Sequence, residues 1–218
     1  EAQYGMAQRY LIGNGVEKNI EQYISWLSKA AEGGYPKAQG SAECNAELLL
    51  CADTYEEEGN YEKAYQFYHK AATTGNVMAQ YKLATFKLEG KGCERDPMAA
   101  VGWLSKVVEN EEKNIENEKI IEVIISYYQL GKIYETGIDG FVSKNIEKSE
   151  GYYKRAYDVI QKYCPGYFDE IVEEFFRYGK GGLKINTEKA DRLREQRKLN
   201  LELEGKVIHD EIEEELEM

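Results

Sequence analysis

Residues with catalytic or metal-binding chemistry are few and widely spaced in this chain. The two histidines, His69 and His209, lie about 140 positions apart. Only His209 has a carboxylate four residues on, at Glu213, and a single pair of this kind on an acidic helix does not indicate a metal site. The cysteines contain no C-x-x-C pair and no zinc-ligand spacing, so we expect free thiols packed between helices. They are Cys44, Cys51, Cys93 and Cys164.

Two glycine–lysine runs have a composition that suits phosphate binding. They are Gly90-Lys91-Gly92 and Gly179-Lys180-Gly181-Gly182. Neither belongs to a G-x-x-x-x-G-K-[ST] or G-x-G-x-x-G motif. Both fall at one position of an internal repeat, which favours a structural turn. Acidic runs such as Glu56-Glu57-Glu58 and Glu173-Glu174 are typical of solvated helix faces rather than of catalytic carboxylate pairs. We therefore predict no enzyme, no cofactor and no metal site.

The composition limits the class of partner. Of 218 residues, 28 are Lys or Arg and 40 are Asp or Glu, which gives a formal net charge of −12. Nucleic acids and anionic membranes recruit clustered cations, so we expect neither as a partner. Hydrophobic residues make up 42% of the chain, enough for a core, and no stretch approaches the roughly 20 apolar residues of a membrane span.

An internal repeat of 36 residues organises the chain. Ala2 opens the segment AQYGMAQRYLIGNGV, and Ala79 opens AQYKLATFKLEGKGC, in which the apolar positions and glycines coincide. Both tryptophans, Trp26 and Trp103, occupy one repeat position, and we expect them to be buried or mostly buried between neighbouring hairpins, with neither forming a ligand pocket. Further copies begin at Ser126, span about 47–75 and, in degenerate form, span about 166–197.

Each copy predicts a helix, a glycine loop and a second helix. Met6, Ala7 and Tyr10 form an apolar stripe of helical period. Gly13 should end the first helix, since glycine takes a positive φ cheaply. Asn19 is the expected N-cap of the second helix. Its equivalents in the other copies are Asp96, Asn145 and Asn186.

The pattern A-x-Y-x-L-G/A-x-x-Y-x-x-G-x-G-V, followed by D/N-x-x-x-A-x-x-W/Y-x-x-K-A-A-x-x-G, resembles the Sel-1-like repeat family. These helical hairpins are related to tetratricopeptide repeats, and the resemblance covers roughly residues 1–197. It implies an all-α, right-handed α-solenoid that serves as a scaffold or adaptor for other proteins, with no catalytic residues. The physics agrees, because one hairpin cannot bury its own apolar face and must stack on neighbours.

We divide the chain into a repeat solenoid of about five hairpins over 1–198 and an acidic capping helix over 199–218. Ile208, Ile212 and Leu216 form the apolar stripe of that cap. The stretch 109–125 interrupts the repeat spacing. We interpret it as an N-terminal extension of the next first helix, with Ile121, Ile124 and Tyr128 along one stripe, and expect its isoleucines to cover the preceding hairpin. A patch for partner binding or self-association is the alternative.

The expected function is binding of proteins or peptides in a groove made mainly by first helices, and the acidic charge favours basic segments. The alternative is a regulatory subunit that activates or inhibits a cell-envelope or protein-degradation enzyme. Reduced thiols favour the cytoplasm. The chain opens inside a repeat, so we expect a fragment of a longer protein and leave a signal peptide open. The candidate partner-binding residues are Tyr4, Gln8, Asp53, Glu56, Tyr81, Thr85, Tyr128, Lys132, Glu135 and Glu174.

Overall fold

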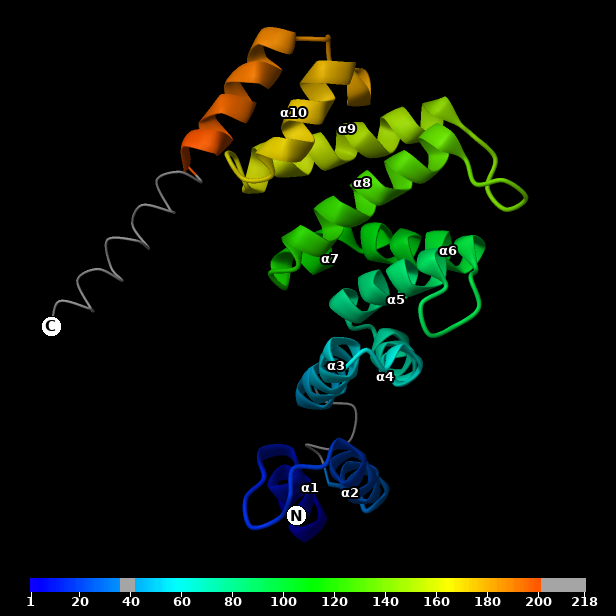
Figure 1. Ribbon diagram of the computed structural model, residues 1–218, viewed down its shortest axis with the longest axis vertical. Helices are drawn as coiled ribbons and strands as arrows, with labels where there is room; N and C mark the ends of the chain where they lie inside the picture. The colour runs from blue at the N-terminus through cyan, green and yellow to red at the C-terminus, as the bar shows by residue number, and fades with distance from the viewer. Residues whose placement is uncertain (36–41, 201–218) are drawn as a thin grey trace, which may run out of the picture. The chain divides into compact units, whose positions relative to one another are not determined.

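The fold consists of paired α-helices, as Figure 1 shows for the computed structural model. The structure describes residues 1–35 and 42–200. Within these ranges there is no β-strand, only an isolated bridge between Ile138 and Val142. The expected all-α class is therefore confirmed. The expected cap over 199–218 lies outside the described residues except for its first two, and it stays a prediction.

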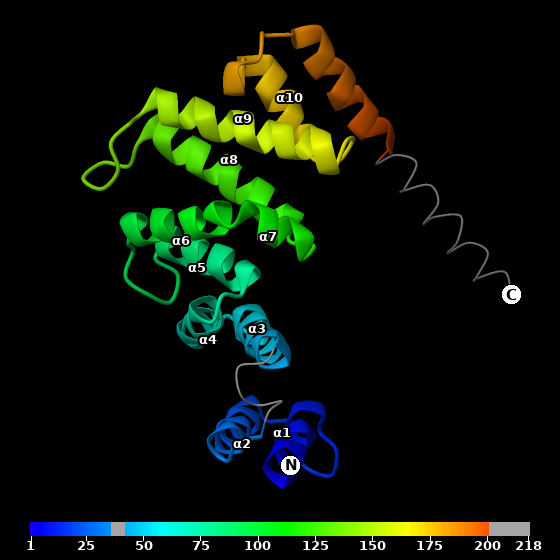
Figure 2. The same ribbon diagram turned by 180° about the vertical axis from the view of Figure 1, so that it is seen from behind.

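The chain divides into two compact units, Glu1–Asn114 and Ile115–Met218. In the first unit three hairpins follow one another, and within each hairpin the two helices pack together (Figure 2). The fourth helix also packs against the fifth. The helices are α1 (Ala2–Ile12), α2 (Ile20–Glu32), α3 (Ala42–Glu57), α4 (Tyr61–Thr73), α5 (Val77–Glu89) and α6 (Pro97–Glu109).

The second unit is built around one long hairpin, in which α8 (Ile120–Thr136) packs along α9 (Ile146–Tyr163). The next first helix is α10 (Asp169–Tyr178), followed by a short 3-10 helix, η2 (Lys180–Gly182), which packs against α9. A further helix covers 187–200. The same order of first helix, glycine loop and second helix is therefore present in both units.

The predicted N-caps are confirmed in all four copies. The side-chain oxygen of Asn19 accepts a hydrogen bond from the backbone N–H three residues on, at 2.9 Å. The equivalent bonds at Asp96, Asn145 and Asn186 measure 3.0, 2.9 and 2.9 Å. Each cap therefore satisfies one backbone donor that the first helical turn leaves without a partner.

The same four cap residues also close the loop behind them. The backbone N–H of Asn19 donates to the carbonyl of Tyr10, near the end of the first helix, at 2.9 Å. Asp96, Asn145 and Asn186 make the equivalent bond at 2.8 Å. One residue thus starts the second helix with its side chain and ties it to the first helix with its backbone.

The core lies between the helices of each hairpin and between neighbouring hairpins. Its largest fully buried side chains include Tyr23, Tyr68 and Tyr153, one from each of three second helices. Trp26 and Trp103 are partly buried and pack at the edge of the core, in agreement with the expectation that they are buried or mostly buried. Three residues on, Lys29 and Lys106 hold their ammonium groups 4.5 and 3.9 Å from the indole centres.

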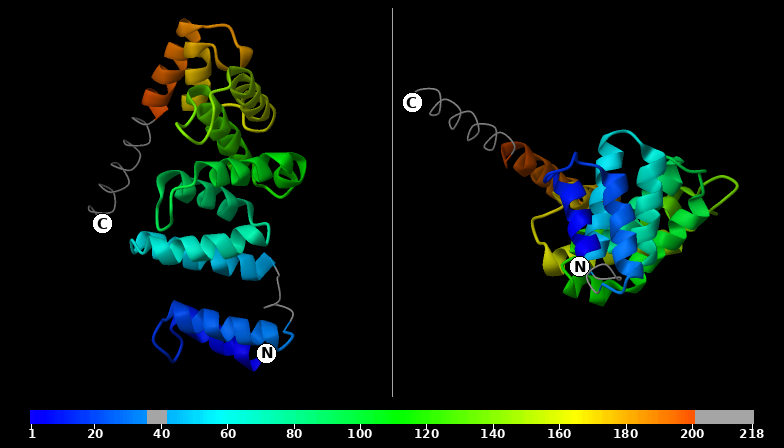
Figure 3. Two further views of the ribbon diagram at one scale, coloured as in Figure 1. Left: turned by 90° about the vertical axis from the view of Figure 1, so that its right-hand side faces the viewer. Right: turned by 90° about the horizontal axis from the view of Figure 1, so that it is seen from below.

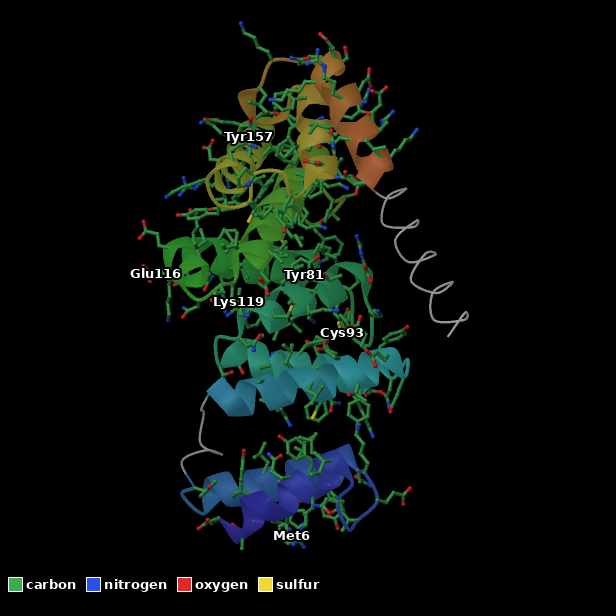
Figure 4. The ribbon with its side chains drawn as sticks, turned by 90° about the vertical axis from the view of Figure 1, so that its left-hand side faces the viewer. Met6, Tyr81, Cys93, Glu116, Lys119 and Tyr157 are labelled. Carbon is green, nitrogen blue, oxygen red and sulfur yellow. The ribbon has the colours of Figure 1, made fainter. Side chains whose placement is uncertain are left out.

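The insertion at 109–125 differs from the expected continuous helix. It forms a separate short helix, α7 (Glu111–Glu116), and α8 begins only at Ile120. Glu118 has a φ of +62°, which interrupts the helical backbone between α7 and α8. Figure 4 labels its neighbours Glu116 and Lys119. The buried Asn114 amide donates to the carbonyl of Val107 at 2.7 Å and ties α7 to α6.

The isoleucines of the insertion do not share one buried stripe. Ile124 is fully buried, whereas Ile121 is 55% exposed and Tyr128 is half-buried. The expected stripe of these three residues is therefore wrong at Ile121. The alternative, in which the exposed Ile121 belongs to a patch for partner binding or self-association, stays a prediction.

The cysteines that the structure resolves are free, as expected. Cys51 is buried, and Cys93 and Cys164 are half-buried. Cys93, labelled in Figure 4, lies in the loop after α5, and its thiol contacts the carbonyl of Phe86 at 3.7 Å. Its pKa is raised, mainly because burial disfavours the thiolate. It is therefore a packing residue at neutral pH.

The second glycine of the loop is where one hairpin meets the preceding one. A Cβ on Gly92 would lie 2.1 Å from the carbonyl oxygen of Tyr61, at the start of α4. A Cβ on Gly181 would lie 2.7 Å from the backbone nitrogen of Lys154 on α9. At Gly15, which has a similar φ of +74°, nothing lies within 4 Å. Figure 3 shows the hairpins of the first unit from two further directions.

This difference predicts unequal effects of the same substitution. Gly15→Ala should lower the free energy of unfolding by about 1 kcal/mol, the cost of a left-handed non-glycine residue. Gly92→Ala should cost about 3 kcal/mol or more, because its methyl group also collides with backbone. Urea denaturation followed by circular dichroism measures both. Equal losses would show that the loop does not fix the stacking of α5–α6 on α3–α4.

Candidate partner-binding surface and its charge networks

All ten candidate residues lie on first helices. Nine are half-buried and Lys132 is exposed. The first unit holds six of them, on α1, α3 and α5, and the second unit holds four, on α8 and α10. Figure 4 labels Tyr81 on α5. Among them, Asp53 and Glu56 meet at the hydroxyl of Tyr68, and Glu135 and Glu174 meet at the ammonium group of Lys180.

Glu56 is the centre of a hydrogen-bond network in the first unit. Its carboxylate accepts bonds from the hydroxyl of Tyr68 at 2.6 Å and from the ammonium groups of Lys82 and Lys91, each at 3.0 Å. The Tyr68 hydroxyl also lies 2.6 Å from Asp53. Burial opposes ionisation of Glu56, but the three donors outweigh it and lower its pKa to about 2. Burial and the two carboxylates raise the pKa of Tyr68, which stays protonated.

Lys180 is the centre of the corresponding network in the second unit. Its side chain is 11% exposed, and its ammonium group lies 2.8 Å from Glu135 and 2.6 Å from Glu174. The Tyr153 hydroxyl donates to Glu135 at 2.6 Å, and the Tyr128 hydroxyl donates to Glu174. Burial opposes the charge on Lys180, but the two carboxylates raise its pKa. Burial likewise opposes the charge on Glu135, and Lys180 and Tyr153 lower its pKa.

The two networks use the same repeat positions. A glutamate near the end of a first helix accepts from a tyrosine of its own second helix and from a lysine of the next glycine loop. In the first unit these are Glu56, Tyr68 and Lys91, and in the second they are Glu135, Tyr153 and Lys180. The tyrosines also contact equivalent phenylalanines, with ring centres 5.2 and 5.5 Å apart. Two other copies carry leucines in place of the glutamate and tyrosine, namely Leu11 with Leu27 and Leu88 with Leu104.

The charge of the candidate surface is therefore more balanced than the sequence analysis indicated. The ten candidate residues include four carboxylates and a single base, Lys132. Lys82, Lys91 and Lys180 supply three further cations, all within 3.0 Å of a candidate carboxylate. The sequence contains a signal for Lys91 and Lys180, because the two glycine–lysine runs carry these lysines at the same loop position. Asp53 forms no ion pair with any of the described cations.

The remaining candidates make fewer contacts. The Tyr4 ring lies 5.1 Å from that of Tyr35. The Thr85 hydroxyl donates back to the Tyr81 carbonyl at 3.3 Å, a bond within α5. The exposed Lys132 holds its ammonium group 5.4 Å from the Tyr128 ring centre. Tyrosine rings and one carboxylate are thus the groups that this surface offers in the first unit.

Over residues 1–35 and 42–200, no three His, Cys, Asp or Glu side chains gather in a way that could hold a metal ion. In the same part of the chain, no helix combines the length and the apolar character that a membrane crossing requires.

The low pKa of Glu56 predicts acid-dependent stability. Its ordinary value is 4.5 and its folded value about 2, so the unfolded chain binds the proton first as the pH falls. The stabilisation is complete above about pH 4.5 and is lost as the pH falls to about 2. Glu56→Gln should lower the free energy of unfolding at pH 7 by about 2 kcal/mol, since the side chain keeps some contact with water, and should flatten this part of the pH profile. Urea unfolding at pH steps from 7 to 2 tests it, and a variant with the parent's slope would contradict it.

Lys180 and Glu135 should be energetically coupled. Lys180→Met leaves two carboxylates without their cation and should cost about 2 kcal/mol, and Glu135→Gln leaves a partly desolvated ammonium group with one partner fewer. The double variant should cost at least about 1 kcal/mol less than the sum of the single costs. Thermal and urea unfolding of the four proteins provide the cycle. Additive losses would mean that the contact at 2.8 Å contributes no stability of its own.

Solved structures of repeat proteins resemble this chain. A protective antigen of uropathogenic Escherichia coli that displays an SLR fold matches with a TM-score of 0.57 and 24% identity, over 88% of this chain and 36% of that protein. A Sel1 repeat protein from Oxalobacter formigenes matches with a TM-score of 0.57 and 22% identity, over 88% of this chain and 70% of that one. Both likenesses concern the fold.

Sequence comparison gives a further relative and a family. The chitin synthase regulator SKT5 of Saccharomyces cerevisiae is 32% identical over 114 residues, which are 52% of this chain but only 16% of that protein. The Sel1 repeat family matches residues 1–35, 53–76, 77–109 and 124–158. These segments overlap the four hairpins formed by α1–α2, α3–α4, α5–α6 and α8–α9. Since they cover more than half of its residues, the chain belongs to the Sel1 repeat family.

Proposed function

We propose that this chain is a protein-interaction module that binds a partner protein or peptide along the first-helix face of its hairpins. Sel1 repeat proteins generally mediate protein–protein interaction, which supports the class of function. The observation that carries the proposal is the position of all ten candidate residues on first helices, nine of them half-buried. Half-buried side chains held by neighbours lose little conformational freedom when a partner binds.

The proposed surface in the first unit has a definite chemistry. Tyr4 and Tyr81 offer aromatic area at a low entropic cost, which suits a recognition surface. The carboxylate of Asp53 accepts one bond from Tyr68 and forms no ion pair with any described cation. A basic residue of the partner would pair with Asp53, while Glu56 is already paired with Lys82 and Lys91. The partner segment therefore combines one basic residue with apolar side chains.

A second candidate function is regulation of an enzyme. The relative from Saccharomyces cerevisiae is a chitin synthase regulator, which supports a regulatory subunit of a cell-envelope enzyme. The match spans 16% of that protein, so regulation by this chain is part of the proposal. As a regulatory subunit, the chain would contribute no catalytic group and would act by binding the enzyme.

Photocrosslinking tests the surface directly. A photoreactive phenylalanine analogue at position 81 should crosslink a partner protein in source-cell extract, whereas the same group at Ile146, which is 49% exposed on α9, should not. The double variant Asp53→Ala/Tyr81→Ala should weaken binding of the purified partner at least tenfold, because it removes the proposed ion pair and an aromatic contact.

The control is Lys144→Ala, which changes an exposed loop residue of the second unit and should leave the affinity unchanged. Crosslinking only from position 146, or equal affinity of the double variant and the parent, would reject the first-helix surface. If the partner is an enzyme, its rate with and without the chain separates the regulator from a passive adaptor.

A further inference from the structure

Two second helices of the first unit each carry an exposed lysine beside an aromatic ring. Lys70 on α4 lies 5.3 Å from the ring centre of Phe67, and Lys106 on α6 lies 3.9 Å from that of Trp103. In Figure 1, α4 and α6 lie on one side of the first unit and α3 on the other.

These lysines have no anionic partner among the described residues. Lys82, Lys91 and Lys180 each form an ion pair at 3.0 Å or less, but Lys70 and Lys106 form none. An aromatic ring holds each ammonium group in place without neutralising its charge. The full positive charge of Lys70 and Lys106 is therefore available to an anion.

A hollow accompanies these cations. An open hollow of about 360 Å³ on the surface of α4 is lined by Tyr65, Gln66, His69 and Lys70. The His69 ring connects it to α6, since its centre lies 6.3 Å from that of Trp103 in an edge-on arrangement. The hollow thus offers two aromatic rings with a cation beside them.

We propose that this second-helix face, formed by Tyr65, Gln66, His69, Lys70, Trp103 and Lys106, binds an acidic peptide segment. An apolar side chain of the segment packs on the open hollow lined by Tyr65, Gln66 and His69, and carboxylates on either side pair with Lys70 and Lys106. Charge complementarity selects this occupant, because a basic segment would meet two cations that no carboxylate neutralises. The site uses other helix faces than the proposed function and does not depend on it.

Synthetic peptides test the charge preference. Fluorescence anisotropy on the full chain would use a labelled dodecapeptide with the sequence Glu-Glu-Leu-Glu repeated three times, and two versions with Ser or Lys at every Glu position. The acidic peptide should bind at least tenfold more tightly than the Ser version, despite the net negative charge of the chain. Equal or tighter binding of the Ser or Lys peptide would overturn the inference.

Paired variants then locate the site. Lys70→Ala/Lys106→Ala should weaken binding of the acidic peptide about tenfold, the combined effect of two exposed charge contacts. Lys144→Ala/Lys184→Ala removes the same charge from exposed positions of the second unit and should change the affinity less than twofold. Circular dichroism melts verify that both variants fold. Equal losses in the two pairs would show a nonspecific effect of net charge and reject the site.

The first-helix variant Asp53→Ala/Tyr81→Ala separates this inference from the proposed function. It should leave binding of the acidic peptide unchanged. If it abolishes that binding while Lys70→Ala/Lys106→Ala does not, the acidic peptide occupies the first-helix face and the second-helix site is rejected, although partner binding by the first helices would stand.

Discussion

The close approach of a glycine loop to the preceding second helix is the contact on which the rest of each unit depends. Gly92 lies against the backbone of Tyr61, and Gly181 lies against that of Lys154, at distances that leave no room for a side chain. This approach brings the lysine one position earlier back to the preceding hairpin, where it meets the glutamate near the end of the first helix. A bulkier residue at either glycine would push the loop away and lengthen the contacts of Lys91 with Glu56 and of Lys180 with Glu135.

The stacked hairpins of this chain therefore use two kinds of chemistry at equivalent positions. Where the first helix ends in a glutamate, a buried tyrosine and the lysine of the next loop complete its hydrogen bonds, which offsets the cost of removing the charge from water. Where it ends in Leu11 or Leu88, the second helix also carries leucine, and apolar burial serves instead. A glutamate beside a leucine would have no such compensation. The glutamate, the tyrosine and the loop lysine therefore occur together, and so do the two leucines.

The features that sequence alone predicts here are those decided within a few residues. The N-caps at Asn19, Asp96 and Asn145 depend on a bond three positions along the chain, and all three form. Features that depend on distant residues could not be found in the same way. Lys180 meets Glu135 across 45 positions, and Lys91 meets Glu56 across 35. The candidate residues were placed on the correct helices, but their charge balance was not, because loop lysines had been assigned to turns alone.

The pairing of Glu56 and Tyr68 with Lys91 also bears on how such arrays evolve by duplication. A copied segment that began and ended at hairpin boundaries would separate the glutamate and tyrosine from the lysine that follows them. It would place a lone cation beside leucines, or a lone anion beside a loop without lysine. The segment that recombination can transfer without loss thus starts in one first helix and ends after the next glycine loop, so the unit of inheritance is out of phase with the unit of structure.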